Sequence, residues 1–287
     1  MPTFRYTLID VFAAHPLEGN LLAVVEEADG IDDETMATLA RRFRLSETSF
    51  IQTASSLTAD YRHRIFIVDG EIPFAGHPSL GTAAVWAHRH GLAEADLVQQ
   101  TLSGEQRLHV MLRGTSGTAD IWQNPAEFGP EVDPVPILEA LGLPASAAHD
   151  ALPAQVLSTG LPTLIVPLDD PANLGHVRLD TQRLAAALAR LADGSRPVTC
   201  YVVAEAGPGD WRARSFGVDL AGGEDPATGS AAGPFGAYLK ARIGLRRLTI
   251  TQGVEMRCPS VLRVDTSDGI KVSGDVHIVG EGVLGLP

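Results

Sequence analysis

Cysteine is scarce in this chain of 287 residues, which holds only Cys200 and Cys258. Two cysteines cannot form the dense disulfide framework of a small secreted protein, and they cannot complete a four-ligand zinc site without histidine. No segment approaches the roughly 18 uninterrupted apolar residues that a membrane-spanning helix needs. The first ten residues carry one positive charge and an apolar run that Asp10 breaks, which does not fit a signal peptide. We therefore expect a reduced, cytoplasmic protein.

Positive charge is also in short supply. The chain has 22 Lys and Arg against 35 Asp and Glu, for a formal net charge of -13. Such a field repels phosphate backbones and anionic lipid surfaces, so we expect neither nucleic acid nor a membrane as a partner. The hydrophobic share of 45% is that of an ordinary globular protein. The length suits roughly two domains of about 150 residues, each able to bury a core without a metal staple.

Hydrophobic periodicity predicts a mixed α+β fold. Strands are expected over residues 4–12, 20–25, 49–53 and 61–67, with two more over 97–112. A helix is indicated by Met36, Leu39, Ala40 and Phe43, which share one face, and Asp32 is placed to cap its free amides. A second helix is predicted to start at Pro78. It is apolar on nearly every side, so we expect it inside the protein.

A proline-rich stretch over residues 123–153 is the best candidate for a domain boundary. We expect an N-terminal lobe of residues 1–122, completed by a C-terminal strand over 276–287. The C-terminal lobe is then 123–275, with 123–153 as its linker. Within it the helical stripe returns at Leu184, Ala187, Leu188 and Leu191 behind Asp180, and strands are expected over 198–204 and 211–216.

The two halves appear as copies of one unit. Asp32 and Asp180 are 148 residues apart, and so are Pro78 and Pro226, each of which is predicted to open an apolar helix. In this register His77 aligns with Asp225. Coincidence between two alanine-rich helices is the alternative, but one offset for both a cap and a proline favours duplication.

In each copy, the N-terminus of the predicted buried helix directly follows a tight polar loop. Free amides and the positive end of the helix dipole make such ends anion receptors. If the copies face one another across a pseudo-twofold axis, both ends point into one cleft, where amides near Gly229 and Ser230 could bind a small carboxylate. Phosphate suits the cleft less, because Glu224 and Asp225 have no Lys or Arg beside them and no Walker motif is present.

Three side chains are candidates for chemistry, and each has a more ordinary explanation. Asp225 before a proline is most often a helix cap, and His77 could be a loop histidine bonded to backbone. Their equivalent positions in the repeat favour a shared site. Glu47 could be a solvated surface charge, but its apolar neighbours suggest the partial burial and raised pKa of a general acid/base.

Several motifs resemble the phenazine biosynthesis-like (PhzF-like) family, whose fold is that of diaminopimelate epimerase. The matching segments are Asp10–Phe12 with Gly19–Val25, Ser46–Ser49, Glu71–Pro78, Glu224–Ala231, and Gln252–Gly253 with Pro259–Ser260. They extend over nearly the whole chain. The resemblance implies two similar lobes, each a curved β-sheet or barrel around a central helix, with the active site between them and a homodimeric assembly.

The same resemblance implies a cofactor- and metal-independent isomerase of a small carboxylate, with trans-2,3-dihydro-3-hydroxyanthranilate as the substrate of its best-known members. Glu47 would move the proton, His77 and Asp225 would orient substrate and help to manage protons, and the substrate-binding residues would be Asn20, Gly76, Gly229 and Ser230.

Two alternatives remain open at this point. One is a racemase or epimerase of an amino or hydroxy acid, and the other is a non-catalytic protein that binds a small carboxylate. Epimerases of the resembled fold employ a facing pair of cysteines at the two helix-end loops. Neither Cys200 nor Cys258 stands at such a loop in this sequence, which ranks carboxylate-driven isomerisation first.

Overall fold

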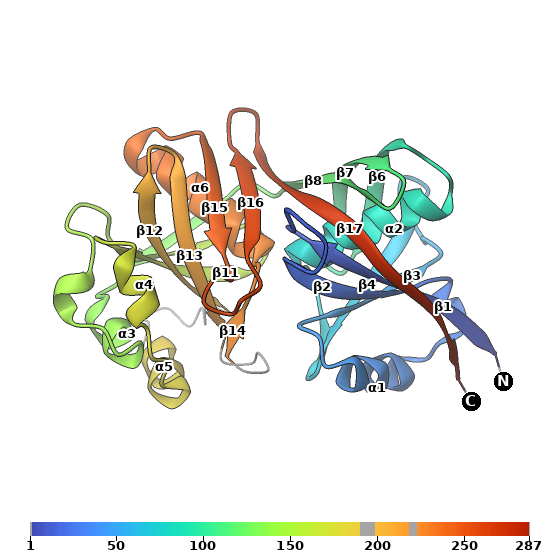
Figure 1. The fold of residues 1–287 in the computed structure, drawn as a ribbon, viewed down its shortest axis with the longest axis horizontal. Coiled ribbons are helices and arrows are strands. Elements are labelled where there is room, and N and C mark those ends of the chain that lie inside the picture. The colour runs from blue at the N-terminus through green and yellow to red at the C-terminus, as the bar shows by residue number, and fades with distance from the viewer. Residues whose placement is uncertain (1, 190–198, 218–222, 287) are drawn as a thin grey trace. The chain divides into compact units, whose positions relative to one another are not determined.

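A computed structural model describes residues 2–189, 199–217 and 223–286 (Figure 1). The chain divides into two compact units, each described here by itself. Unit 1 comprises residues 1–122 and 271–287, and unit 2 comprises residues 123–270. The C-terminal segment thus returns to the unit in which the chain begins.

The strands of unit 1 pair into a closed ring. They are β1 (Thr3–Val11), β2 (Asn20–Val25), β3 (Thr48–Gln52), β4 (Tyr61–Ile67), β6 (Glu94–Thr101), β7 (Gly104–Arg113), β8 (Ser116–Gln123) and β17 (Ile270–Gly285), with β5 (Gly70–Ile72) attached to β4. Each pairs with the next in this order, and β17 runs antiparallel to β1. Closure removes the two free edges that an open sheet of these strands would expose.

Helix α2 (Gly76–Arg89) fills the interior of this barrel. It contacts β1, β2, β3, β4, β6 and β7, and nearly all of its residues are buried, as its apolar sequence predicts. The helix lies close to the strands at Gly81, where a Cβ atom would come within 2.7 Å of the Leu22 side chain. Glycine at this position therefore allows the tight packing of helix against sheet.

Unit 2 contains a sheet in the order β9-β10-β11-β12-β13-β15-β16. The bounds are β9 (Glu127–Glu131), β10 (Gln155–Ser158), β11 (Pro162–Leu168), β12 (Thr199–Gly207), β13 (Asp210–Gly217), β15 (Arg247–Gln252) and β16 (Ser260–Asp265), with β14 (Glu224–Asp225) attached to β13. Helix α6 (Gly229–Ile243) packs against β10, β11, β15 and β16 and is buried over most of its length. It is the counterpart of α2.

A second apolar layer of unit 2 joins α3 (Val135–Ala140), α4 (Ala172–His176) and α5 (Thr181–Leu188) to the sheet. Cys200, Val202 and Ala204 of β12 and Phe216 of β13 are buried in this core. Two short 3-10 turns, η1 (Ala28–Gly30) and η2 (Ala145–Ala147), complete the elements. The proline-rich stretch 123–153 therefore contains β9, α3 and η2 rather than a plain linker.

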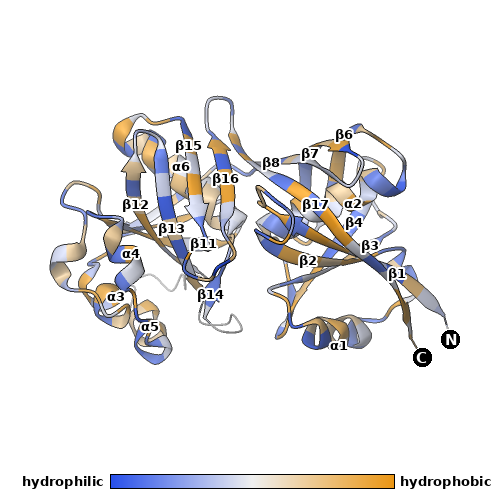
Figure 2. Cartoon of the chain, in the orientation of Figure 1, coloured by the Kyte–Doolittle hydropathy of each residue, from blue (hydrophilic) through white to orange (hydrophobic). Residues whose placement is uncertain are grey.

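The capped amphipathic helix occurs in both units, as predicted. Helix α1 (Asp33–Phe43) begins behind Asp32, whose carboxylate accepts a hydrogen bond from the Thr35 amide at 2.7 Å. Helix α5 begins 148 residues later, and Asp180 accepts from the Arg183 amide at 3.0 Å. Figure 2 shows hydrophobic and hydrophilic residues side by side on α1. Leu191, the last residue of the predicted stripe in α5, lies outside the described residues.

The predicted helix starts at Pro78 and Pro226 are wrong. Helix α2 begins two residues before Pro78, whereas α6 begins three residues after Pro226. Proline is tolerated throughout the first turn of a helix, because the amides there have no intrahelical acceptor. A proline therefore does not determine the residue at which the helix starts. The two helices start at Gly76 and Gly229, 153 residues apart, and His77 therefore corresponds to Ser230 rather than to Asp225.

Within the described residues, none of the helices combines the length and the apolar content that crossing a membrane requires.

Candidate active site

Unit 1 brings together Glu47, His77 and Asn20. Asn20 is the first residue of β2, Glu47 lies immediately before β3, and His77 is the second residue of α2. Glu47 Oε2 is 3.3 Å from His77 Nε2, and Asn20 Nδ2 is 3.2 Å from His77 Nδ1. The side chain of His77 is almost fully buried, while that of Glu47 keeps 13% of its surface exposed. Gly76 precedes His77 at the start of the helix and is buried.

The hydrogen bonds indicate which nitrogen of His77 carries the proton. Burial lowers the pKa of His77 to about 3, and the nearby His63 adds to this effect, so the ring is neutral at pH 7 and holds one proton. The Asn20 amide nitrogen can only donate, so Nδ1 accepts and Nε2–H faces the Glu47 carboxylate. His77 is thus neutral, and its Nε2–H lies on the side of the Glu47 carboxylate, 3.3 Å from Oε2.

A buried polar chain lies behind this pair, and the sequence reasoning missed it. The Ser49 hydroxyl donates to His63 Nε2 at 2.8 Å, and His63 Nδ1 donates to Gln99 Oε1 at 2.9 Å. The Gln99 amide then donates to Ser79 Oγ at 2.8 Å, and Ser79 donates to the carbonyl of Ala75 at 2.7 Å. The alternating pattern of β4 placed His63 on a buried face, but no local signal marked its partners on three other elements.

This chain connects the two elements that carry the catalytic candidates. Ser49 is two residues after Glu47, and Ala75 is two residues before His77. Every donor in the chain meets an acceptor when His63 is neutral, and burial lowers the pKa of His63 to about 4. The network therefore fixes the strand that follows Glu47 against the first turn of α2.

We expect a specific dependence of stability on pH from these histidines. Their folded pKa values lie below the unfolded value of 6.5, so the unfolded chain binds more protons once the pH falls below 6.5. The contribution of the two neutral histidines to the free energy of unfolding is complete above pH 6.5. Below that pH, the contribution of each histidine declines by about 1.4 kcal/mol per pH unit, down to about pH 4 for His63 and about pH 3 for His77.

The check is urea unfolding of the wild type and His63→Gln between pH 7.5 and 5. The difference in free energy between the two proteins should shrink as the pH falls, because the variant has lost one of the protonation penalties. His15→Gln, at an exposed histidine, should keep the wild-type slope. A constant difference for His63→Gln would show that His63 does not titrate in this way.

Unit 2 holds the other candidates at the start of α6. Asp225 on β14 is buried, its Oδ2 accepts from Thr228 Oγ1 at 2.6 Å, and its carbonyl accepts from the Gln252 side chain at 2.8 Å. Ser230 is also buried, and the carbonyl of Gly229 accepts from the Gln123 amide at 2.9 Å. Asp225 is therefore not the helix cap: Thr228 is the N-cap residue of α6, and Asp225 accepts its hydroxyl from within β14.

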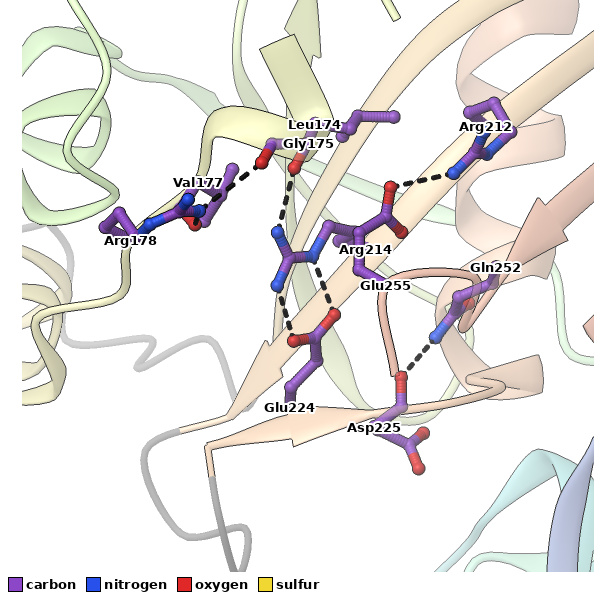
Figure 3. A network of polar contacts seen from close by, with 10 residues as sticks. All are labelled: Leu174, Gly175, Val177, Arg178, Arg212, Arg214, Glu224, Asp225, Gln252 and Glu255. Atoms are coloured by element: carbon purple, nitrogen blue, oxygen red, sulfur yellow. Dashed lines mark hydrogen bonds and ion pairs between the residues drawn. The ribbon is translucent and has the colours of Figure 1, made fainter. Parts of the chain in front are cut away.

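The fold brings a positive charge to Glu224, although no Lys or Arg lies beside it in the sequence. Arg214 on β13 forms two hydrogen bonds with the Glu224 carboxylate, at 2.7 and 2.6 Å (Figure 3). Sequence proximity could not reveal this pair, because ten residues separate its members. The cation is occupied by a carboxylate, so it gives no support to a phosphate site.

Neither cysteine stands in the first turn of α2 or α6. Cys200 is fully buried in β12, where burial raises the pKa of its thiol to about 12, and Cys258 is half-buried in the turn after β15. A thiol held protonated in an apolar core is a poor base.

The site of unit 1 can therefore support proton transfer by a carboxylate. The Glu47 carboxylate could accept a proton, the neutral His77 ring lies 3.3 Å from it, and Asn20 holds that ring. An oriented, partly desolvated carboxylate is what abstraction of a proton next to a conjugated system needs.

Comparison with known proteins agrees with the expected family. The family model "PhzC-PhzF: Phenazine biosynthesis-like protein" matches residues 9–286. The chain is 33% identical to a trans-2,3-dihydro-3-hydroxyanthranilate isomerase of Pseudomonas chlororaphis, over 98% of this chain and 99% of that protein. It is 35% identical to an uncharacterized isomerase of Mesorhizobium japonicum, over 92% of this chain and 91% of that protein.

Solved structures confirm the predicted fold class. A predicted epimerase from Pseudomonas aeruginosa is 34% identical and superposes with a TM-score of 0.85, covering 99% of this chain and all of that one. A hydroxyproline epimerase from Agrobacterium vitis reaches a TM-score of 0.68 at 12% identity, covering 99% of this chain and 93% of its own, and shows the shared fold alone. The chain is thus a member of the phenazine biosynthesis-like protein family and an isomerase of that family.

Proposed function

We propose that this isomerase moves a proton within a small carboxylate substrate, with Glu47 as the acid/base. The observation that carries the proposal is the Glu47 carboxylate held 3.3 Å from the Nε2 of a neutral, buried histidine. A carboxylate so placed can take a proton from one carbon and return it to another. The Glu47 carboxylate then carries the same number of protons before and after the cycle, as an isomerisation requires.

The donor Nε2–H of His77 has two uses in this scheme. It orients the Glu47 carboxylate before the reaction, and it can hydrogen-bond to negative charge that develops on the substrate. Because burial lowers the pKa of His77 to about 3, the ring does not compete with Glu47 for the transferred proton near neutral pH. Asn20 keeps the ring in this tautomer.

The residues of unit 2 are proposed to contribute to substrate binding and proton handling. Amides at the start of α6, near Gly229 and Ser230, lie at the positive end of the helix dipole, where a substrate carboxylate is favoured. Asp225 is kept in place by Thr228 and Gln252, and its carboxylate could hold a substrate amine or hydroxyl. Gly76 offers the corresponding start of α2.

The proposed substrate class rests on the names of the relatives. Trans-2,3-dihydro-3-hydroxyanthranilate, named for the Pseudomonas relatives, carries a carboxylate and an amine on an unsaturated ring, which suits the groups above. We propose it, or a molecule with the same three features, as the substrate. We also propose a cytoplasmic homodimer that needs no metal or organic cofactor.

The test is incubation of the purified protein with trans-2,3-dihydro-3-hydroxyanthranilate in deuterated water. We expect an isomerised product that carries deuterium at the carbon that receives the proton, detected by mass spectrometry and NMR. A parallel incubation with L-proline and trans-4-hydroxy-L-proline, followed by chiral chromatography, tests the racemase alternative suggested by the shared fold. Inverted product there, with no isomerised product from trans-2,3-dihydro-3-hydroxyanthranilate, would refute the proposal.

A non-catalytic binder would give a third outcome. The candidate substrate would raise the unfolding temperature of the protein and be recovered unlabelled.

A further inference from the structure

An arginine–glutamate pair of the same geometry occurs in both units. In unit 2, Arg214 Nε and an NH2 group donate to the two carboxylate oxygens of Glu224, at 2.7 and 2.6 Å. In unit 1, Arg64 makes the same two contacts with Glu71, at 2.9 and 2.6 Å. All four side chains are largely buried, with 9% to 19% of their surface exposed.

The aromatic surroundings of the two pairs match as well, while the third contact of Arg64 is with the Asp33 carboxylate of α1, at 2.6 Å. The guanidinium carbon of Arg64 lies 5.2 Å from the ring centre of Phe66, and that of Arg214 lies 5.1 Å from the ring centre of Phe216. Phe66 is paired with Glu71 across the strands, and Phe216 is paired with Glu224. Each arginine stands two residues before its phenylalanine, so the pair is one arrangement that occurs in both copies.

Each glutamate also stands five residues before the buried helix of its unit. Glu71 precedes Gly76 at the start of α2, and Glu224 precedes Gly229 at the start of α6. The connection from phenylalanine to glutamate is three residues longer in unit 2 than in unit 1. The spacing from glutamate to helix is nevertheless the same in both units. The position of the pair therefore corresponds to the start of the helix and not to the length of the turn between phenylalanine and glutamate.

The strand that carries Glu224 is short, and Gln252 and Thr228 hold its second residue, Asp225. β14 has two residues, and its pairing with β13 consists of Phe216 with Glu224 and Ser215 with Asp225. Arg214 anchors this short strand through Glu224 and also donates to the carbonyl of Leu174 in α4, at 2.8 Å (Figure 3). Asp225 follows Glu224 directly, so the Arg214 anchor adds to the hydrogen bonds that Gln252 and Thr228 make with Asp225.

We propose that Arg214 and Glu224 are positioning residues for Asp225 and the first turn of α6, and that Arg64 and Glu71 do the same for His77 and the first turn of α2. This inference rests on the proposed roles of Asp225 and His77. A planar guanidinium fits a carboxylate through two parallel hydrogen bonds and stacks on a ring, and a lysine ammonium can do neither. Replacing the arginine therefore removes the orientation while the charge stays.

The chain offers a matched control on the same strand. Arg212 of β13 donates to Glu255 through a single contact of 2.8 Å, and Glu255 lies in the turn that follows β15. Arg212→Lys thus makes the same chemical change two residues away, at a pair that does not carry a catalytic candidate.

The first experiment measures local order by hydrogen exchange and mass spectrometry, and it does not depend on activity. Arg214→Lys and Glu224→Gln should each raise the exchange rate of amides over residues 223–232 by about tenfold, because short strands open locally when their anchor is lost. Arg64→Lys and Glu71→Gln should do so over residues 70–80. Arg212→Lys should leave both segments at the wild-type rate.

The second experiment measures kinetics on the substrate identified above. Misplacing a reacting group by a fraction of an ångström lowers the rate by about ten- to a hundredfold, so Arg214→Lys should lower kcat with a smaller change in KM. The midpoint of urea unfolding is measured on the same samples, and Arg212→Lys should keep the wild-type kcat.

Two results would overturn the inference. One is exchange that rises equally in both units after a change in only one pair, which would indicate a general loss of stability. The other is an equal response of Arg212→Lys and Arg214→Lys. If the wild-type protein does not turn over the proposed substrate, the proposed function fails, but local exchange still decides whether the pairs position the helix starts.

Discussion

Glu47→Gln is expected to lower kcat by about 10² to 10⁴-fold, the usual contribution of a positioned acid/base. Glutamine has nearly the shape of glutamate and fits in the same place, where Glu47 Oε2 lies 3.3 Å from His77 Nε2. It cannot accept the substrate proton. Deuterium incorporation should therefore be lost together with turnover, while the protein remains folded.

Two further variants serve as comparisons for Glu47→Gln. Glu47→Asp keeps the carboxylate but shortens the side chain, so it should retain more activity than Glu47→Gln. Glu94→Gln changes an exposed carboxylate in the same unit, with 69% of its side chain exposed, and should leave kcat unchanged. If Glu47→Gln still exchanges deuterium at the wild-type rate, the base is another residue and the proposed role of Glu47 is wrong.

Phe235→Ala is expected to reduce the free energy of unfolding of unit 2 by about 3–5 kcal/mol, the usual cost of deleting a fully buried aromatic ring. Phe235 lies on α6 and is completely buried. Its ring packs edge-on against Trp211 at 5.0 Å and against Tyr201 at 6.1 Å, and it stacks with Tyr238 at 6.4 Å. Alanine would leave a cavity in the middle of this aromatic group.

Urea unfolding provides the measurement, with hydrogen exchange to assign the loss to a unit. Phe235→Leu, which keeps most of the apolar volume, should cost about 1–2 kcal/mol less than Phe235→Ala. The exchange of buried amides in unit 1 should stay at the wild-type level. A loss below about 1 kcal/mol for Phe235→Ala would mean that the site collapses around the missing ring.

Many elements of the fold could be predicted from local pattern. The apolar stripe from Met36 to Phe43 and the Asp32 cap predicted α1 correctly, and alternation around His63 predicted β4. These features depend on residues within one or two turns of each other, so their signal is contained in a short window of sequence. The start of α6 was missed because proline is tolerated at several early helix positions, and Pro226 lies outside the helix.

The candidate site was only partly within reach of such reasoning. The motifs that resemble the family named Glu47, His77 and Asn20, but thirty residues separate Glu47 from His77 and fifty-seven separate Asn20 from His77. The wrong alignment of His77 with Asp225 arose from one fixed offset of 148. Loops of unequal length between the copies change that offset along the chain, and it reaches 153 at the buried helices.

By itself, the sequence determined the type of most elements, the twofold repeat and the family, because these follow from periodicity, caps and short motifs. The tertiary structure decided which side chains meet. It joined β17 to β1, placed the polar chain from Ser49 to Ala75 behind the catalytic candidates, and set Arg64 on Glu71 and Arg214 on Glu224. Strand pairing and burial bring these residues together, and both depend on the whole unit rather than on neighbours along the chain.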